Sequence, residues 1–476
     1  MQYEVVIGLE IHAQLKTESK VFCGCKTIYG NSPNSQTCPI CLGMPGTLPV
    51  LNEKVIEFAA KAGLALECKI RLNSRTARKN YFYPDLSKGY QISQYDEPMC
   101  EFGKIEIFSG EDRAKVLGIT RIHIEEDSGK SVHGFGDKTA VDFNRCGTGL
   151  IEIVSEPDMR SPEEARAYLV KLKQILEYLE VSDCNMEEGS LRVDANISLR
   201  PFGQKELGTK TEMKNMNSFR AVEKALYSEI ERQGKVLDNG GEIQQVTMLW
   251  NENLNQARVM RTKEDAHDYR YFPEPDLLPI EITEGYLADI KSQLPELPDA
   301  KMRRFSADYK LGKEAISTLV LDKNWSAWFE EVVQAGSDPV EASKWVTVEV
   351  LRVIKERLIS IDEFPISPLK LSQLIKEIEK DSISKQAGKK VFDHMLDDHS
   401  DVSLIIEKLG LKQVSDTRNL EVIIRDIKEK YSTEVSRFQN GESKLLGFFM
   451  GQVMKESQGK ANPKIIAPLI QKIIGD

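Results

Sequence analysis

Short runs in which apolar and polar residues alternate constrain the fold of this chain more than any other feature. In the first run, at 7–15, successive side chains of an extended strand point to opposite faces. One face carries Leu9, Ile11, Ala13 and Leu15, and the other carries Glu10, His12 and Gln14. The alternation returns at 121–125, 150–154 and 190–198. Strands of this kind predict a mainly antiparallel sheet with one apolar face and one polar face.

The polar faces of these runs gather side chains suited to chemistry. A solvated sheet face usually carries interchangeable Lys, Thr, Ser and Glu, whereas these runs place carboxylates, imidazoles and arginines there. The candidates for metal binding and catalysis are Glu10, His12, Glu125 and Glu152. Oxygen ligands with few nitrogens suit Mg²⁺, which keeps waters and bridges to substrate phosphates. A single histidine on a strand is more often structural, but His12 stands two positions from Glu10, which favours a ligand role.

Length and composition indicate a globular protein of two or three domains. The chain has 476 residues, more than one compact core usually holds, with 41% hydrophobic and 29% charged residues. No basic stretch followed by an apolar run opens the sequence, and no apolar segment approaches the roughly 18 residues of a membrane helix. We therefore expect a cytoplasmic protein without membrane contact. The net charge of −10 argues against indiscriminate nucleic-acid binding.

The residue pattern changes once along the chain. The first part interrupts its strands with helices at 54–66, after Ser161, and at 217–233; Ser161 is the expected cap of the second, with Pro162 in its first turn and Glu164 completing a capping box. Prolines then concentrate between 273 and 298, and helical periodicity follows. The fold class is therefore α+β, with a sheet domain at 1–294, an all-helical domain at 295–405 and a small helical tail at 406–476.

The tail contains two clear helices and a local excess of positive charge. The first spans 443–457, and the second is capped by Asn462 with Pro463 at its first position. Between residues 443 and 472 the only acid is Glu456. The lysines that could contact RNA there are Lys444, Lys455, Lys460 and Lys464. Solvated helix faces would explain these lysines equally well.

Two short cysteine pairs predict a metal site in a loop at 23–41. They are Cys23 with Cys25, and Cys38 with Cys41. Four thiolates at this spacing fit a closed tetrahedral Zn²⁺ site, which we favour over four unconnected thiols. Because a full thiolate shell has no open position for water or substrate, the zinc should be structural.

The segment at 78–91 mixes cations with aromatic residues, a combination that suits phosphates and bases or equally half-buried packing. The chain has no Walker-type loop and no kinase signature, so a nucleotide would bind in a less common manner. Further on, Lys210, Glu212 and Lys214 share one face of a strand, and Asn217 or Ser218 can cap the helix that follows.

Long motifs in a fixed order give the chain a family resemblance over essentially its whole length. It resembles the B subunit of the bacterial glutamyl/aspartyl-tRNA amidotransferase, a complex of A, B and C subunits. The matching runs are Val6–His12, Ala77–Asp85, His123–Asp127, Val141–Arg145, Glu152–Pro157, Leu191–Asn196, Lys214–Phe219, Asp268–Pro273, Gly447–Met454 and Gly459–Pro463. Members often have proline where this chain has Ser87 and Gly149, and only some members have the cysteine quartet. The archaeal paralogue has a large inserted domain for which this chain has no room.

The resemblance implies a fold and a reaction. The sheet domain would be the family's cradle-shaped catalytic domain, and the tail its YqeY-like tRNA-binding module. Such subunits use ATP and Mg²⁺ to phosphorylate the side-chain carboxylate of Glu or Asp on a misacylated tRNA. Ammonia, released from glutamine by the A subunit and passed through a channel, then yields Gln-tRNA(Gln) or Asn-tRNA(Asn). The chain would thus be a carbon–nitrogen ligase, active with its A and C partners.

The resemblance also assigns roles to residues. Glu10, His12, Glu125 and Glu152 would bind the metal, while Lys79, Lys88 and Arg192 would contact phosphates. The Gly-Gly-Ser-Ser run of amidase partners is missing, as expected for a subunit without the glutaminase nucleophile. Two alternatives stay open: a non-catalytic tRNA-binding scaffold, and a stand-alone metal-dependent hydrolase that uses the same carboxylates.

Overall fold

The computed structural model describes residues 3–109, 113–135, 138–262, 269–412, 417–457 and 461–475. The chain divides into two compact units, Met1–Pro298 and Asp299–Asp476. The first is built around a large sheet with helices and the second is helical, which confirms the predicted α+β class. None of the described helices has the length and apolarity that crossing a bilayer requires.

Nine described strands form the large sheet, in the order β14-β13-β12-β11-β1-β10-β7-β6-β2. Their bounds are β1 Tyr3–Gln14, β2 Lys69–Ile70, β6 Cys100–Ser109, β7 Arg113–Glu126, β10 Gly149–Ser155, β11 Leu191–Pro201, β12 Thr211–Lys214, β13 Val246–Asn251 and β14 Gln256–Thr262. Neighbouring strands pair antiparallel except β12 and β13, which pair parallel. The expected mainly antiparallel sheet is confirmed.

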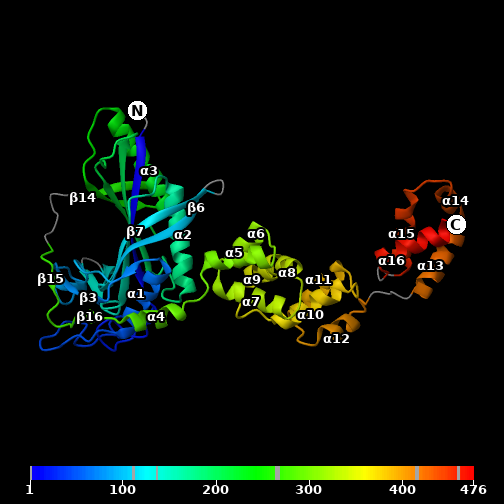
Figure 1. Ribbon diagram of the computed structural model, residues 1–476, viewed down its shortest axis with the longest axis horizontal. Helices are drawn as coiled ribbons and strands as arrows, with labels where there is room; N and C mark the ends of the chain where they lie inside the picture. Colours follow the sequence, from blue (N-terminus) through cyan, green and yellow to red (C-terminus); the bar gives the residue numbers. More distant parts are fainter. Residues whose placement is uncertain are drawn as a thin grey trace. The chain divides into compact units, whose positions relative to one another are not determined.

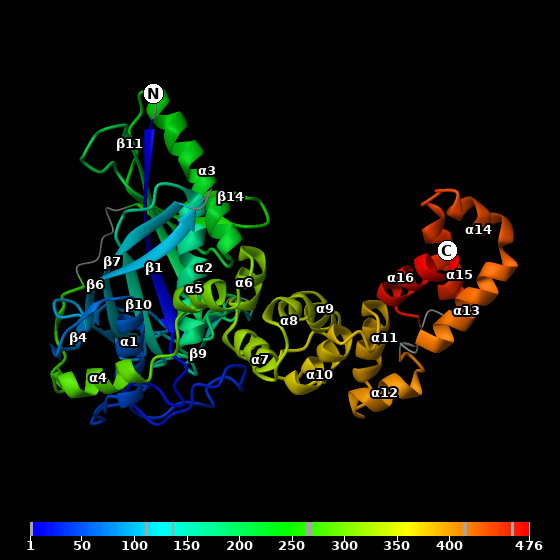
Figure 2. The same ribbon diagram turned by 45° about the vertical axis from the view of Figure 1, so that its right-hand side comes forward.

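One face of this sheet packs on helices and forms the core of the first unit. Leu9 and Ile11 point to this side and are buried, as the alternation in β1 predicted. Three helices supply the facing apolar side chains: α1 (Glu53–Ala65), α2 (Pro162–Tyr178) and α3 (Phe219–Asp238). Figures 1 and 2 show α2 and α3 running along the strands. The opposite face of the sheet stays free of these helices.

Side-chain caps fix where these helices begin. Asn52 and Ser218 accept hydrogen bonds at the starts of α1 and α3, and Ser161 accepts the backbone N–H of Glu164 at the start of α2. Only one of the two hydrogen bonds of the expected capping box at α2 forms, so that prediction is wrong for Glu164. The Glu164 carboxylate accepts the backbone N–H of Arg160 at 2.7 Å, one residue before the cap, and also binds Lys115.

Three smaller sheets complete the described strands of the first unit. Their strands are β3 (Asn73–Ser74) with β16 (Ile280–Glu281), β4 (Ala77–Asn80) between β5 (Tyr90–Ser93) and β15 (Phe272–Pro273), and β8 (Lys130–Phe135) with β9 (Lys138–Asp142). Arg78 of β4 forms a bidentate ion pair with Glu274, at 2.7 and 2.8 Å. This contact links the segment that carries β15 to β4. Gly89 lies just before β5 with φ of +74°, in the left-handed region that favours glycine.

The second unit consists of helices in its described parts. Their bounds are α5 Pro298–Asp308, α6 Lys313–Leu319, α7 Lys323–Gln334, α8 Pro339–Lys344, a π-helical turn at Trp345–Val350, α9 Leu351–Arg357, α10 Pro368–Glu379, α11 Lys385–Met395 and α12 Val402–Lys408. The helix that precedes this unit is α4, Glu284–Ser292. The predicted division into three domains stays a prediction; its boundary after residue 405 lies within α12.

The last four helices share a core of their own. They are α13 (Thr417–Lys430), α14 (Ser432–Gln439), α15 (Leu445–Glu456) and α16 (Pro463–Ile474), drawn in orange to red in Figure 1. Phe449 of α15 and Ile470 of α16 are fully buried in this core with Ile424 of α13. The two helices predicted at the end of the sequence are confirmed, and Asn462 caps α16 by accepting the N–H of Lys464 at 2.9 Å.

Candidate active site

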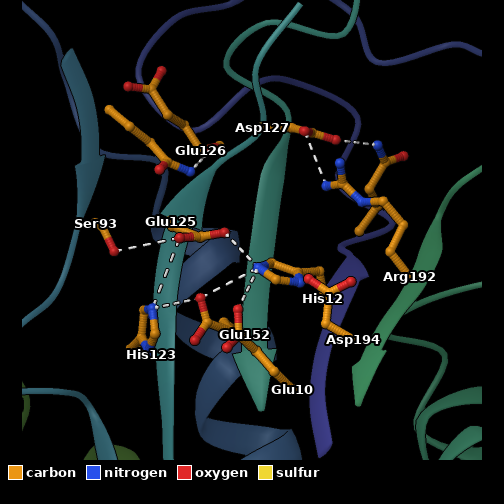
Figure 3. A network of polar contacts seen from close by, with 12 residues as sticks. Glu10, His12, Ser93, His123, Glu125, Glu126, Asp127, Glu152, Arg192 and Asp194 are labelled. Atoms are coloured by element: carbon orange, nitrogen blue, oxygen red, sulfur yellow. Dashed lines mark hydrogen bonds and ion pairs between the residues drawn. The ribbon is translucent and has the colours of Figure 1, made fainter. Parts of the chain in front are cut away.

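Four predicted ligands from three strands converge on the polar face of the large sheet. In the strand register His12 of β1 stands opposite Glu152 of β10. His12 Nε2 lies 3.2 Å from Glu152 Oε2, 3.4 Å from Glu125 Oε1 and 3.8 Å from Glu10 Oε1. Figure 3 shows these side chains in front of the strands, directed toward one another. We call Glu10, His12, His123, Glu125 and Glu152 the carboxylate–imidazole cluster.

His123 belongs to this cluster and was not among the predicted site residues. It stands opposite Glu152 in the β10–β7 register, and its Nε2 lies 3.4 Å from Glu152 Oε2 and 3.8 Å from Glu125 Oε2. The side chain is buried, and its Nδ1 has no hydrogen-bond partner among the described residues. The sequence held the signal for it, because the alternation at 121–125 puts His123 on the same face as Glu125.

Opposite charges shift the protonation equilibria of the cluster strongly. Burial alone would raise the pKa of Glu152, but the imidazoles of His123 and His12 hold this pKa well below its usual range. Burial alone would lower the pKa of His123, yet Glu152 and Glu125 raise it to about 9. Burial, together with the negative charge of Glu152, raises the pKa of Glu10. Protonated imidazoles therefore neutralise the carboxylates of the cluster.

The donor set of the cluster fits a hard divalent cation. One triad consists of Glu10, His12 and Glu152, and a second of His123, Glu125 and Glu152; within each, one ligand atom per residue lies within 4.8 Å of the others. Carboxylate oxygens dominate both triads, as Mg²⁺ requires. Glu10 is one-third exposed, so the cluster stays open to solvent on the side of that residue.

Arg192 flanks the cluster and is held by a buried carboxylate. It stands opposite His12 in the β1–β11 register. Its Nη2 lies 3.0 Å from Oδ1 of Asp127, whose side chain is 2% exposed. Gln14 donates to the other oxygen of Asp127 at 2.7 Å. Figure 3 shows Arg192 and Asp127 beside His12. The guanidinium of Arg192 therefore lies at the edge of the cluster, where it could bind an anion.

The two lysines predicted to contact phosphate differ in their surroundings. Lys79 Nζ lies 4.8 Å from the ring centre of Tyr269, and among the described residues no carboxylate comes within 4 Å of it. Burial would lower the pKa of Lys79, but the phenolate charge of Tyr271 and the carboxylate of Glu125 raise it. Lys88 Nζ instead binds Glu126 Oε2 at 2.6 Å, and only 10% of its side chain is exposed. Lys79 is thus the better placed of the two to meet an anion near the cluster.

The four cysteines at 23–41 lie together, all reduced. Their sulfur atoms lie within 4.8 Å of one another. The Cys38 backbone N–H donates to Cys41 Sγ at 3.1 Å, and the buried Lys20 ammonium lies 3.6 Å from the same sulfur. A hydrogen bond from Cys23 and the N–H of Cys38 lower the pKa of Cys41 to about 4, while burial raises the pKa of Cys25 to about 11. Four clustered sulfurs, one of them with a lowered pKa, fit a tetrahedral metal site.

The predicted RNA-contacting lysines are exposed where the structure describes them. Lys444 precedes α15, Lys455 lies in its last turn, and Lys464 lies in the first turn of α16. Lys464 Nζ pairs with Asp381 at 2.9 Å. Lys460 lies outside the described residues.

Comparison with known proteins covers both units. Residues 5–288 match the family model of the GatB/GatE catalytic domain, and residues 327–474 match that of the GatB domain. The chain is 52% identical to the aspartyl/glutamyl-tRNA(Asn/Gln) amidotransferase B subunit of Thermodesulfovibrio yellowstonii over 474 residues, with a coverage of 100% of each chain. The corresponding B subunits of Caldanaerobacter subterraneus and Chlorobium phaeobacteroides are 52% and 50% identical over 99% and 100% of each chain. The chain therefore belongs to the family of aspartyl/glutamyl-tRNA(Asn/Gln) amidotransferase B subunits.

Proposed function

We propose that this chain is the synthetase subunit of a tRNA-dependent amidotransferase. It would use ATP to phosphorylate the side-chain carboxylate of Asp or Glu on a misacylated tRNA, and would then guide amidation of that group. The observation that carries the proposal is the convergence of Glu10, His12, Glu125 and Glu152 on the open polar face of the sheet. The names of the full-length relatives support the same substrate class.

The chemistry explains why such a site needs acids and cations. A carboxylate is a poor electrophile near neutral pH. In the first step one of its oxygens attacks the γ-phosphorus of ATP, the bond to ADP breaks, and an acyl phosphate forms on the amino acid. In the second step ammonia attacks the acyl carbon, inorganic phosphate leaves with the transferred oxygen, and a proton is lost to give the amide. Phosphoryl transfer of this kind depends on positioning and charge neutralisation.

The residues of the cluster and the cations near it would have separate roles in this reaction. Glu10, His12, Glu125 and Glu152 would hold Mg²⁺, which would neutralise phosphate charge as the γ-phosphoryl group moves. Lys79 and Arg192 would bind phosphate oxygens, and Asp127 would keep Arg192 in place. Lys88 is a weaker candidate because Glu126 already neutralises it.

The remaining parts would serve assembly and substrate capture. Cys23, Cys25, Cys38 and Cys41 would bind a structural Zn²⁺ that fixes the loop beside β1. An amidase A subunit would supply ammonia from glutamine, a small C subunit would complete the heterotrimer, and the last four helices would bind tRNA. Because its substrate would be made by the translation machinery, the chain would work in the cytoplasm.

Substitution of one cluster carboxylate tests the proposal. In the complex assembled with A and C subunits, Glu125→Ala should abolish ATP cleavage that depends on misacylated tRNA, while assembly and glutaminase activity persist. Glu106→Ala is the matched control, since Glu106 lies on the neighbouring strand β6 and is half-buried. Wild-type ATP cleavage in the Glu125→Ala complex would instead support a non-catalytic scaffold. Hydrolysis of phosphoesters by the isolated chain would support a metal-dependent hydrolase.

A further inference from the structure

A second hollow lies on the polar face of the large sheet, next to the cluster. It encloses about 270 Å³ and reaches Glu10 at one side. Its walls include Val6, Gly8, Val154, Pro157 and Leu207. We call it the Gly8 pocket. Ligand sites for whole small molecules run from about 300 Å³ upward, so a space of this size suits the end of a larger ligand that continues past Glu10.

The pocket forms where the pairing of β10 with β1 ends. β10 pairs with β1 only as far as Val154 opposite Glu10, and its register shifts between Val154 and Ser155. Gly8 therefore faces Asn196 of β11 on one side and has no partner from β10 on the other. Because Gly8 has no side chain, the floor stays open; a Cβ there would lie 3.7 Å from Cα of Pro157. Any larger side chain at position 8 would enter the pocket.

Three polar side chains that have no side-chain partner among the described residues line this mostly apolar hollow. The Asn196 amide and the Ser198 hydroxyl line the pocket, and neither bonds to another side chain or backbone group in the described parts of the chain. Ser198 is only 4% exposed. Lys210 also lines the pocket and, among the described residues, forms no ion pair. Buried hydrogen-bonding groups are normally satisfied, so the buried Ser198 hydroxyl points to a ligand. Asn196 is half-buried and Lys210 is exposed, and both side chains are accessible to the same ligand.

We infer that the Gly8 pocket binds an adenine base. The side-chain amide of asparagine can pair with N6 and N7 of adenine through two hydrogen bonds, and Asn196 offers this amide between apolar walls. The inference rests on the proposed function, which supplies two ligands that carry adenine: ATP and the 3′-terminal adenosine of the tRNA. A base in the pocket would place the rest of either ligand beside Glu10, where the cluster begins.

Kinetics of pocket variants in the assembled complex test this inference. Asn196→Ala should raise the KM for ATP about tenfold and reduce the preference for ATP over inosine triphosphate, whose base has a carbonyl in place of the 6-amino group. Gly8→Val should raise the same KM by filling the pocket. Asn73→Ala is the matched control, because Asn73 is an exposed strand residue outside the pocket and should leave both values unchanged.

The outcomes separate the two sources of adenine. A raised KM for ATP identifies the nucleotide, whereas a raised KM for misacylated tRNA with an unchanged KM for ATP identifies the tRNA end. If folded Asn196→Ala and Gly8→Val complexes keep both KM values and the preference for ATP over inosine triphosphate, the inference is wrong. Absence of tRNA-dependent ATP cleavage in the wild-type complex would overturn the proposed function instead.

Discussion

His123 Nε2 and Glu152 Oε2 lie 3.4 Å apart across adjacent strands β7 and β10. His12 approaches the same oxygen from β1 at 3.2 Å, so the Glu152 carboxylate is held between two imidazoles. His12 is partly exposed, whereas His123 is buried behind the carboxylates. We therefore expect His123 to act as a positioning residue that orients Glu125 and Glu152 toward the open side of the cluster.

Substitution of His123 should weaken metal binding more than nucleotide binding. In His123→Gln the two carboxylates lose their charged neighbour and their fixed orientation. Changes to groups that orient ligands commonly cost about 10–100-fold in metal affinity. We expect the Mg²⁺ concentration for half-maximal ATP cleavage to rise about tenfold, and saturating Mg²⁺ to restore most of kcat. A loss of kcat that Mg²⁺ does not restore would instead assign His123 a direct part in the reaction.

The stability of the metal-free chain should fall at alkaline pH because of the same contact. The pKa of His123 is raised to about 9 in the folded chain, from an unfolded value of about 6.5. Its contribution to stability, on the order of 3 kcal/mol, is present below pH 6.5 and is lost as pH rises through 9. Urea unfolding in chelator at pH 6.5, 8 and 10 should show this decline, and His123→Gln should flatten it. Parallel curves for both proteins would contradict the assignment.

Removal of metal from the cysteine quartet should loosen one loop and spare the sheet. The native chain should contain about one zinc ion, and Cys41→Ser should contain none. Limited proteolysis after chelation should cut within residues 23–41, while the core around Ile11 stays protected. Cys68→Ala is the control, since Cys68 is buried and does not belong to the quartet. This variant should bind as much zinc as the native chain. Equal zinc content in all three proteins would exclude the quartet as the site.

Reversal of charge on the last helices should affect tRNA use alone. Lys444 and Lys455 are exposed near the two ends of α15. The double variant Lys444→Glu/Lys455→Glu should raise the KM for tRNA about tenfold at moderate salt, because each lost phosphate contact weakens binding. Glutaminase activity in the assembled complex should stay unchanged. A fall in both activities would mean that these helices support assembly instead.

Point substitutions test the tail better than a deletion from residue 443. Phe449 and Ile470 share a core with Ile424, so such a deletion would expose the apolar side of α13. A variant that removes the tail cleanly would have to end before Thr417, where α13 begins.

The sequence was sufficient to place the residues of the main site on polar strand faces because strand periodicity is strict. Alternation alone put Glu10 and His12 on one polar face, and it placed Glu152 on the polar face of another strand. It could not give the order β11-β1-β10-β7, which depends on pairing between distant segments. The alternation at 121–125 already placed His123 on the polar face, but its contact with Glu152 depends on the register, which sets the two residues opposite each other.

Other features depend on contacts that no local pattern encodes. The neutralisation of Lys88 by Glu126 joins a loop to the end of β7, and the Gly8 pocket arises where β10 leaves β1. The capping box at α2 was predicted from spacing, but Glu164 accepts from Arg160 and binds Lys115 of β7, a tertiary contact. Helix limits in the tail, in contrast, followed from Asn462 and Pro463 because caps are local signals.

The most direct measurement follows the oxygen atoms of the amino acid. The assembled complex would be given ATP, glutamine and a misacylated tRNA whose side-chain carboxylate carries ¹⁸O, and the released inorganic phosphate would be analysed by mass spectrometry. The account predicts one ¹⁸O atom transferred to phosphate per amide formed, and no transfer in the Glu125→Ala complex. Phosphate without ¹⁸O, released while the amide forms, would contradict phosphorylation of the carboxylate at this site.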